Sequence, residues 1–533
     1  MKHWIGISFV WCMILHRPGL LSFGRAIPGS EQGDTIRGHW SAWFMAHDST
    51  PLDTILCNWP TGASLLPLPP ISLWIISPYT LLFGAAHALS VLVFLHSLLC
   101  VFGGFVLGRV LSFSKETSFL LGIFLSATPM LAETLSSGVY EYQTLGWVPL
   151  FFATLITTCK GKWIYAPLSA LLYIILTLEC GYYGSAAALA ALFIVAAHTR
   201  SKKGFFGAIF SAIVLFGLSY GVYQIIAPAL EKLSSSQMQA GGDFRVIMGT
   251  AELWALIPGI SPPPPPPGMP DPFISAPPLI VWILFAGATI FSFRKNYWSS
   301  FIAVFFLGIA TQSSWMSWWT DGPLGHFVQN LRRFAAPMTL MMIVTIAYSW
   351  EDVKTKRLSP TSSKIAGILY IVALLWSAQD ALIRYPLLWL PKTPLFAQTI
   401  QQDTNPGAVL VFPQEQEGRK TTSHQYLRTN TSFSNTQARL WFQTQIDRPV
   451  HHYTKLATLI PKEGRRWQFD GGALNKVELQ LLIKQGLRYI LLDHTQLSSA
   501  QKQQTKGLIS SLGYGCTSFD EWGGIDICLL TDR

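Results

Sequence analysis

The stretch GDTIRGHWSAWFMAHD, residues 33–48, decides how the rest of the chain is interpreted. It follows an apolar N-terminal segment and precedes hundreds of mostly apolar residues. Charged and aromatic side chains gather here for the first time, among them Asp34, His39, Trp40 and Trp43. What this cluster can do depends on the side of a membrane on which it lies.

The composition predicts a membrane protein. Of 533 residues, 50% are hydrophobic and 12% are charged, whereas soluble proteins carry about 25% charged residues. The deficit is concentrated between residues 70 and 385, where apolar runs alternate with short polar loops. A membrane-spanning helix needs roughly 20 apolar residues, so we predict an α-helical polytopic membrane protein.

The net charge of +10 does not indicate a nucleic-acid partner. The Lys and Arg residues lie in short loops between apolar runs, which is the distribution that orients helices in a membrane. We find no basic face on a known nucleic-acid-binding fold. The bilayer itself is the predicted partner of this charge.

The apolar runs predict eleven membrane-spanning helices. They cover residues 4–24, 85–108, 117–133, 144–159, 164–180, 184–198, 205–228, 276–293, 297–312, 335–349 and 364–384. A further apolar piece at 71–84 is too short to span comfortably, and we interpret it as a re-entrant or interfacial helix.

Lys and Arg residues divide unevenly between the two sets of loops, fourteen against six. The richer set holds Lys2, Arg109, Lys115, Lys160, Lys162, Arg200, Lys202, Lys203, Arg294, Lys295, Lys354, Lys356, Arg357 and Lys364. The poorer set holds Arg25, Arg37, Lys232, Arg245, Arg332 and Arg333. Because positive residues stay in the cytoplasm, we predict an inner (plasma) membrane protein with a cytoplasmic N-terminus. Its outer segments are then 25–70, 229–275 (which is rich in proline), 313–334 and 385–533.

Residues 1–27 also have features of a signal peptide, with Lys2 before an apolar core. Because His16, Arg17 and Pro18 interrupt this segment, we prefer an uncleaved anchor. Cleavage would leave every later loop on the same side.

The tail has a different character from about residue 393, where polar residues replace the apolar runs. Residues 408–413 and 487–494 are predicted strands, 478–486 is a predicted amphipathic helix, and the last residues predict a hairpin. We therefore divide the chain into a transmembrane domain, 1–392, and a small extracytoplasmic α/β domain, 393–533. Cys516 and Cys528 lie in the two arms of the hairpin, where either a disulfide or two buried thiols is compatible with the sequence.

Several motifs together resemble the GT-C class of membrane glycosyltransferases. They are GDT at 33–35 before a Trp-rich segment, PTGASL at 60–65, YEYQTLGWVPL at 140–150, ECGYYG at 179–184 and LRRFAAP at 331–337. The resemblance covers nearly the whole chain. It implies a GT-C-like fold and a sugar donor linked to a polyprenyl phosphate.

The resemblance places Asp34 as catalytic base or acceptor-orienting group, because a carboxylate can take the proton of a sugar hydroxyl. The alternative is a helix N-cap, and the two roles can coexist. Glu141 is the second catalytic candidate, and a solvated turn is its simpler interpretation. Arg332 and Arg333 are candidates for the donor phosphate or for interfacial anchoring.

The remaining candidates form a predicted substrate-binding set. It comprises Arg37, His39, Trp40, Trp43, Tyr142, Gln143, Glu179 and Tyr183. No metal or other cofactor is predicted, because His39 and His47 do not have a spacing typical of metal ligands. Some GT-C members do use a divalent ion.

The predicted function is transfer of a pentosyl or hexosyl group from a polyprenyl-phosphate donor to an extracytoplasmic glycan, lipid or protein acceptor. The alternative is a non-catalytic protein of the same fold that binds lipid-linked glycans or scaffolds envelope assembly. A transporter is disfavoured, because the sequence has no internal repeat.

Overall fold

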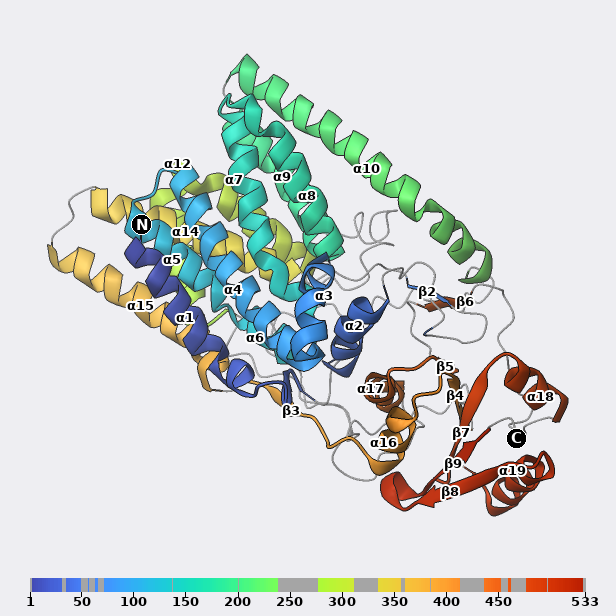
Figure 1. Ribbon diagram of the computed structural model, residues 1–533. Helices are drawn as coiled ribbons and strands as arrows, with labels where there is room; N and C mark the ends of the chain where they lie inside the picture. The colour runs from blue at the N-terminus through green and yellow to red at the C-terminus, as the bar shows by residue number, and fades with distance from the viewer. Residues whose placement is uncertain are drawn as a thin grey trace.

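Apolar helices form most of the first part of the chain in the computed structural model (Figure 1). The structure describes residues 2–30, 35–48, 56, 63–65, 71–136, 138–199, 201–237, 277–310, 334–355, 360–383, 385–412, 436–451, 459–461, 476–495 and 497–530. Gly33, Asp34, the Pro-rich run at 262–272, Arg332 and Arg333 lie outside these residues.

The first half of the helical part contains most of the predicted spans. Its elements are α1 (Lys2–Leu21), β1 (Ala26–Pro28), α2 (Thr35–His47), β2 (Ala63–Leu65), α3 (Ile71–Phe83), α4 (Ala85–Val110), α5 (Lys115–Ser126), α6 (Pro129–Ser136), the 3-10 helix η1 (Tyr140–Gly146), α7 (Trp147–Cys159), η2 (Trp163–Tyr165), α8 (Ala166–Glu179) and α9 (Gly181–His198). The predicted span 117–133 is interrupted before Pro129, because proline cannot donate a backbone hydrogen bond within a helix.

The second half of the helical part begins with the longest helix, which extends beyond its predicted span of 205–228. The elements are α10 (Lys202–Gln237), α12 (Leu279–Ala310), α14 (Ala335–Thr355) and α15 (Pro360–Ile383). At 1.5 Å per residue α10 is about 54 Å long, so it exceeds the roughly 30 Å of a hydrocarbon core. Figure 1 shows it running from the far end of the helical part toward the C-terminal strands.

Two hydrogen bonds show that α12 folds back on itself. Asn296 Nδ2 donates to the Ala288 carbonyl oxygen at 3.0 Å, and the hydroxyl oxygens of Thr289 and Ser300 are 3.2 Å apart. Residues eight apart in a straight helix are separated by about 12 Å. The two halves of α12 therefore lie side by side, in the regions predicted as spans 276–293 and 297–312.

Five described helical segments are long and apolar enough to cross a membrane. They are His3–Leu21, Ala85–Val110, Lys115–Ser136, Gly181–His198 and Lys202–Val222. Five shorter apolar segments, of 10–17 residues, are Ile71–Phe83, Trp163–Glu179, Leu279–Phe291, Asn296–Ala310 and Gly367–Gln379. The predicted number of eleven spans stays a prediction.

Small residues let α4 and α5 approach closely at the centre of the helical part. A Cβ added to Gly104 would lie 2.6 Å from the Gly122 Cα atom, and one added to Gly122 would lie 2.2 Å from the Val101 carbonyl oxygen. Close backbone approach through small residues is typical of packed membrane helices. This crossing anchors the large apolar core of the helical part.

A five-stranded mixed sheet forms the core of the C-terminal part. Its elements are β3 (Leu387–Trp389), α16 (Leu395–Gln402), β4 (Ala408–Phe412), α17 (Thr436–Ile446), β5 (Val450–His451), β6 (Leu459–Pro461), α18 (Lys476–Lys484), β7 (Leu487–Asp493), α19 (Ser499–Ser511), β8 (Gly515–Phe519), η6 (Glu521–Gly523) and β9 (Ile525–Leu529). The strand order is β5-β4-β7-β9-β8, with β4 parallel to both of its neighbours.

Alternate residues of β4 serve the two faces of this sheet. Leu410 and Phe412 join a cluster with residues of α18 and α19, whereas Val409 and Val411 join one with α16 and α17. Such alternation follows from the period of two in a strand. At the far edge β8 and β9 pair antiparallel, and a disulfide joins Cys516 to Cys528.

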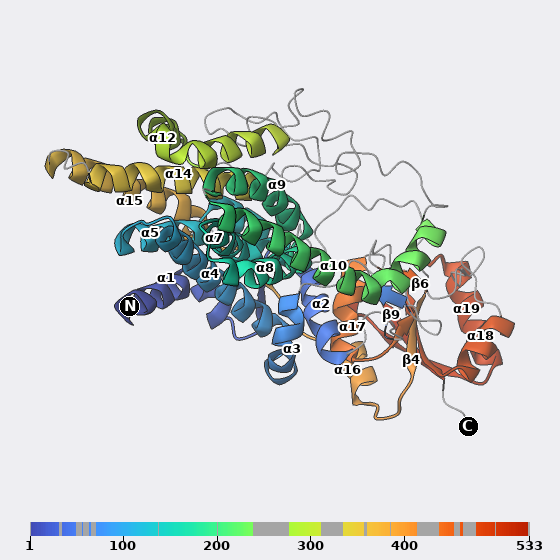
Figure 2. The ribbon, with the colours of Figure 1, turned by 90° about the horizontal axis from the view of Figure 1, so that it is seen from above.

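The helical and C-terminal parts meet along two contacts. Strands β1 and β3 pair antiparallel, with Ala26 opposite Trp389. Helix α2 packs against α17, and Figures 1 and 2 both place these two helices between the helical part and the sheet. Whether residue 393 marks the boundary of a separately folding domain stays a prediction.

Candidate functional site

The first turn of α2 lies directly on the segment that leads into η1. A Cβ added to Gly138 would be 2.2 Å from the Thr35 backbone nitrogen, and one added to Gly38 would be 2.2 Å from the Tyr140 ring. Gly138 also has a φ of +68°, a conformation that side chains disfavour. Two glycines therefore allow segments about a hundred residues apart in the chain to touch.

Hydrogen bonds fix the chain just before α2. Ser30 donates to the Ser136 carbonyl oxygen from its backbone nitrogen at 2.9 Å and from its hydroxyl at 2.6 Å. Thr35 Oγ1 donates to the Ser30 carbonyl oxygen at 2.8 Å. Asp34, with residues 31–33, lies outside the described residues. The residues on either side of this gap, Ser30 and Thr35, are held against the end of α6 and the turn after it.

Glu141 follows Tyr140, the residue that contacts Gly38 of α2, and its side chain is partly exposed. The Tyr140 hydroxyl donates to the Pro28 carbonyl oxygen, which ties η1 to β1 as well. Glu141 therefore lies next to the place where the start of α2 packs against η1. Asp34 directly precedes α2 in the sequence. We call this place, where α2 meets η1, the corner. This corner is the candidate functional site.

Three predicted substrate-binding residues hold η1 in place. The Tyr183 hydroxyl donates to the Tyr142 carbonyl oxygen at 2.9 Å, so α9 supports η1. The Gln143 side-chain nitrogen donates to the Leu131 carbonyl oxygen and to the Thr134 hydroxyl, both at 2.9 Å. All three predicted residues are buried. Their described contacts position η1, and direct contact with substrate remains a prediction.

Glu179 is buried at the end of α8, where it caps helix α3. Its two carboxylate oxygens accept hydrogen bonds from the backbone nitrogen and the hydroxyl of Ser72, each at 2.8 Å. A carboxylate satisfies the free amides of a helix N-terminus and favours its dipole. No sequence pattern predicts this pairing with Ser72, which lies 107 residues away.

The aromatic residues of α2 face the C-terminal part. Trp40 is buried, and its indole nitrogen donates to Gln443 Oε1 at 2.9 Å. Trp43 stacks on His47, whose Nε2 atom lies 3.6 Å from an Asp447 carboxylate oxygen. These contacts run from α2 to α17 and the residue that follows it, and a role of Trp40 and Trp43 in substrate binding stays a prediction.

His39 and Arg37, the two other residues of α2 in the predicted substrate-binding set, differ in burial. His39 is buried, and burial lowers its pKa to about 4, so the ring is neutral at pH 7. Arg37 is half-buried in the first turn of α2. Within the described part of the chain its guanidinium has no hydrogen-bond or ion-pair partner, and its binding of an anion stays a prediction.

Arg332 and Arg333 lie outside the described residues. The next residue, Phe334, is buried against Phe306, with ring centroids 5.6 Å apart. Helix α14 starts directly after Phe334. The C-terminal end of α14 meets the start of α5, so its N-terminal end lies at the end of the helical part where α6 is found. Thr117 Oγ1 donates to Glu351 at 2.6 Å at that other end, and α14 also contacts α6.

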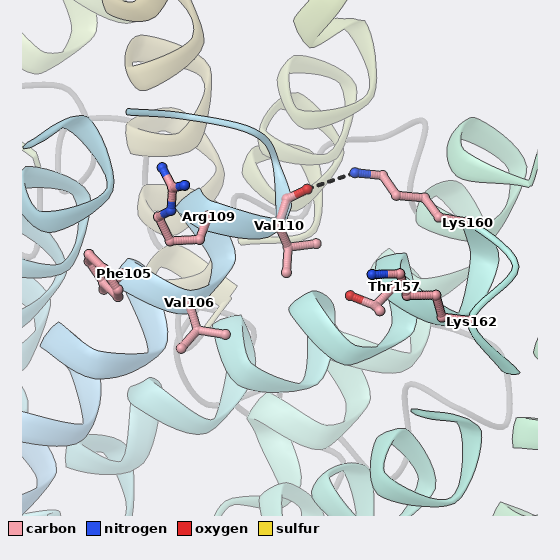
Figure 3. Close-up of a pocket in the computed structure, with 7 residues that line it drawn as sticks. All are labelled: Phe105, Val106, Arg109, Val110, Thr157, Lys160 and Lys162. Carbon is pink, nitrogen blue, oxygen red and sulfur yellow. Dashed lines mark hydrogen bonds between the residues drawn. The ribbon is translucent and has the colours of Figure 1, made fainter. Parts of the chain in front are cut away.

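A basic pocket lies at the opposite end of the helices and is distinct from the candidate site. It has a volume of about 420 Å³ and is lined by Arg109, Lys160 and Lys162 together with Phe105, Val106, Val110 and Thr157 (Figure 3). Lys160 Nζ donates to the Val110 carbonyl oxygen at 2.6 Å. These three cations belong to the set assigned to the cytoplasm from the sequence, and the structure places them together.

Metal ligands do not gather in the described residues. No group of three or more His, Cys, Asp or Glu side chains there is arranged to hold a metal ion.

The fold resembles solved structures, although no family model and no curated protein matches the sequence. The mycobacterial arabinofuranosyltransferase AftD aligns with 100% of this chain and 40% of its own length, at a TM-score of 0.53 and 12% identity. A mutant of AftD aligns at a TM-score of 0.55, again at 12% identity and over 100% of this chain and 42% of its own. An oligosaccharyltransferase from Archaeoglobus fulgidus aligns with 92% of this chain and 69% of its own, at a TM-score of 0.45 and 12% identity.

These likenesses define the class of fold. The chain has a fold similar to that of AftD, in agreement with the GT-C-like fold that the sequence motifs predict. Among solved structures it is similar to AftD, of whose length it spans about 40%.

Proposed function

We propose that the chain is a membrane glycosyltransferase that moves a pentosyl or hexosyl group from a polyprenyl-phosphate donor to an extracytoplasmic acceptor. One observation carries the proposal. Across a chain with the GT-C fold, the first turn of α2 packs against the residues that introduce Glu141. This packing supports a site that draws on both segments.

The proposed reaction needs one proton acceptor and one stabilised leaving group. The oxygen of the acceptor hydroxyl bonds to the anomeric carbon of the donor sugar. Asp34 accepts the proton that this hydroxyl loses. The bond from that carbon to the phosphate oxygen breaks, and polyprenyl phosphate leaves with the electron pair. Arg37, Arg332 and Arg333 are the proposed cations for this phosphate, since arginine binds phosphate oxygens in bidentate geometry.

Glu141 is proposed to orient the acceptor. Its neighbours Tyr142 and Gln143 are fixed by hydrogen bonds, which limits the positions that its backbone can take. A catalytic group must be held within a fraction of an ångström of its productive position. The buried contacts of η1 therefore support a positioned carboxylate.

The test is transfer of radiolabelled sugar by the purified chain in lipid nanodiscs. The donors are polyprenyl-phosphate-linked pentoses and hexoses, and the acceptors are membranes from source cells that lack the chain. Asp34→Asn keeps size and most capping ability but removes the proton acceptor. We expect turnover to fall by about 10²–10⁴-fold, the usual contribution of general acid–base catalysis, with an unchanged melting temperature.

Glu116→Gln is the matched control, because this carboxylate is 58% exposed and lies at the start of α5, far from α2. Equal transfer by wild type and Asp34→Asn would exclude Asp34 from the mechanism. Donor binding by wild type without any transfer would favour the alternative, a non-catalytic protein that binds lipid-linked glycans.

A further inference from the structure

A second cavity lies where the helical and C-terminal parts meet. It has a volume of about 710 Å³, within the range of about 300–1,000 Å³ that small-molecule sites occupy. Its walls come from the turn after α1, from α2, from the turn between α3 and α4, from the end of β3 and the segment after it, and from α17. No ligand of the proposed sugar transfer is assigned to it.

Two buried nitrogen atoms in its walls lack partners. His39 and Trp441 both line the cavity, and their side chains are 5% and 0% exposed. His39 Nδ1 and Trp441 Nε1 have no hydrogen-bond partner in the described part of the chain. An indole N–H is a donor only, and leaving a buried donor unpaired is costly. A ligand that brings hydrogen-bonding oxygen atoms to this wall would remove that cost.

The charged side chains that line the cavity are positive, which favours an anionic ligand. Arg25 and Lys392 line the cavity, and both side chains are exposed. Neither has an ion-pair partner in the described ranges, and none of the described lining residues is acidic. Two uncompensated cations at one mouth favour a phosphate group.

Apolar side chains beside the mouth indicate that the ligand comes from the membrane. Phe83 and Trp389 line the cavity and are 58% and 56% exposed. Phe23, next to the lining residue Gly24, is 73% exposed. Exposed apolar groups at the ends of apolar helices fit the headgroup level of a bilayer, where tryptophan is enriched.

We propose that this cavity binds the headgroup of an anionic phospholipid. The phosphodiester lies between Arg25 and Lys392, the headgroup oxygens meet His39 and Trp441, and the acyl chains leave past Phe83 and Trp389. The lipid then contacts both α2 and α17, so it joins the helical part to the C-terminal part. This inference does not depend on the proposed sugar transfer.

The test uses the full chain in a neutral detergent, with phosphatidylglycerol as the probe. Native mass spectrometry counts the lipids retained, and melting temperature against lipid concentration gives an apparent Kd. We expect one tightly retained phosphatidylglycerol and a rise in melting temperature. In the Arg25→Gln/Lys392→Gln variant binding should weaken about 30-fold, since each cation near an anionic headgroup contributes about fivefold.

Lys476→Gln/Lys484→Gln is the matched control, because it removes the same charge from exposed positions on α18. Trp441→Phe keeps the ring in the wall but removes the donor, and should weaken binding without changing the number of sites. Equal binding by the Arg25→Gln/Lys392→Gln variant and by wild type would overturn the proposal. So would equal stabilisation by phosphatidylcholine, which has no net charge, or by soluble glycerol 3-phosphate, which has no acyl chains.

Discussion

Gly38 and Gly138 decide how closely α2 approaches η1. Neither position has room for a side chain, because the Tyr140 ring or the Thr35 backbone already fills the space. The distance between the two proposed carboxylates depends on this approach, so a change at either glycine should act on the function as well as on stability.

Gly38→Ala tests this contact, and Gly217→Ala is its control. Gly217 lies in α10 with no atom within 4 Å of an added Cβ. Overpacking costs about 1–3 kcal/mol, whereas alanine in an open helix position is favourable by about 0.5–1 kcal/mol. We expect Gly38→Ala to lower both melting temperature and sugar transfer, and Gly217→Ala to lower neither. Unchanged melting of Gly38→Ala would contradict the contact.

His39 makes stability depend on pH. Burial lowers its pKa from 6.5 to about 4, so below pH 6.5 the unfolded chain binds a proton that the folded chain does not. Stability is then lost as pH falls from about 6.5 to about 4. At pH 5 the loss is about 2 kcal/mol, from 1.36 kcal/mol per pKa unit.

Melting in a neutral detergent between pH 7.5 and 5 measures this effect. His39→Phe should melt with a shallower dependence on pH than wild type. Identical slopes for the two proteins would show that His39 is not buried and neutral.

Sequence patterns could not predict the hydrogen-bond partners of single residues, because these partners lie far apart in the chain. The motifs identified Glu179 and Trp40, but their partners Ser72 and Gln443 are 107 and 403 residues away. Nothing in local periodicity encodes such a pairing. A polar residue that caps a buried helix and one that binds substrate therefore look alike in the sequence.

At the level of elements, apolar runs predicted most of the helices, because a run of about 20 apolar residues has few alternatives in a membrane protein. They also predicted the two halves of α12 as separate spans, 276–293 and 297–312, and the contact between Thr289 and Ser300 agrees with that division. They did not predict the contact of α2 with α17, because a Trp-rich amphipathic helix fits a bilayer surface as well as a protein surface.

Trp40→Phe tests the contact between α2 and α17. It keeps an aromatic ring but leaves Gln443 Oε1 without its buried donor, which costs about 1–3 kcal/mol. Trp163→Phe, at a position that is 60% exposed, is the control. We expect a lower melting temperature and faster proteolysis between the two parts only for Trp40→Phe. The same behaviour in both variants would remove this hydrogen bond from the junction.

For the whole molecule, the sequence predicted a helical part followed by an α/β part, from the change in pattern near residue 393. Strands β4 and β7 were recognisable as short apolar runs. Their parallel pairing and the order of the five strands were not, because register between distant strands is set by tertiary packing. The sequence predicted the final hairpin but left the Cys516–Cys528 disulfide open, because the disulfide depends on the register that sets Cys516 opposite Cys528.

The predicted orientation places Lys202 in the cytoplasm and Val450 outside. Basic residues gather at the end of the helices that holds Arg109 and Lys160, which agrees with the positive-inside rule. Alkaline phosphatase and fluorescent-protein fusions at residues 202 and 450 should report opposite compartments. The same compartment for both fusions would overturn the orientation.

The proposed sugar transfer requires the polyprenyl-phosphate donor to bind where α2 meets η1. Photo-cross-linking with a polyprenyl-phosphate sugar that carries a diazirine on the sugar tests this most directly, with peptides mapped by mass spectrometry and unlabelled donor as competitor. Donor binding at this corner should give competed cross-links in peptides that contain Thr35–Gly38 or Tyr140–Gln143. Cross-links confined to the basic pocket of Arg109, Lys160 and Lys162 would contradict it.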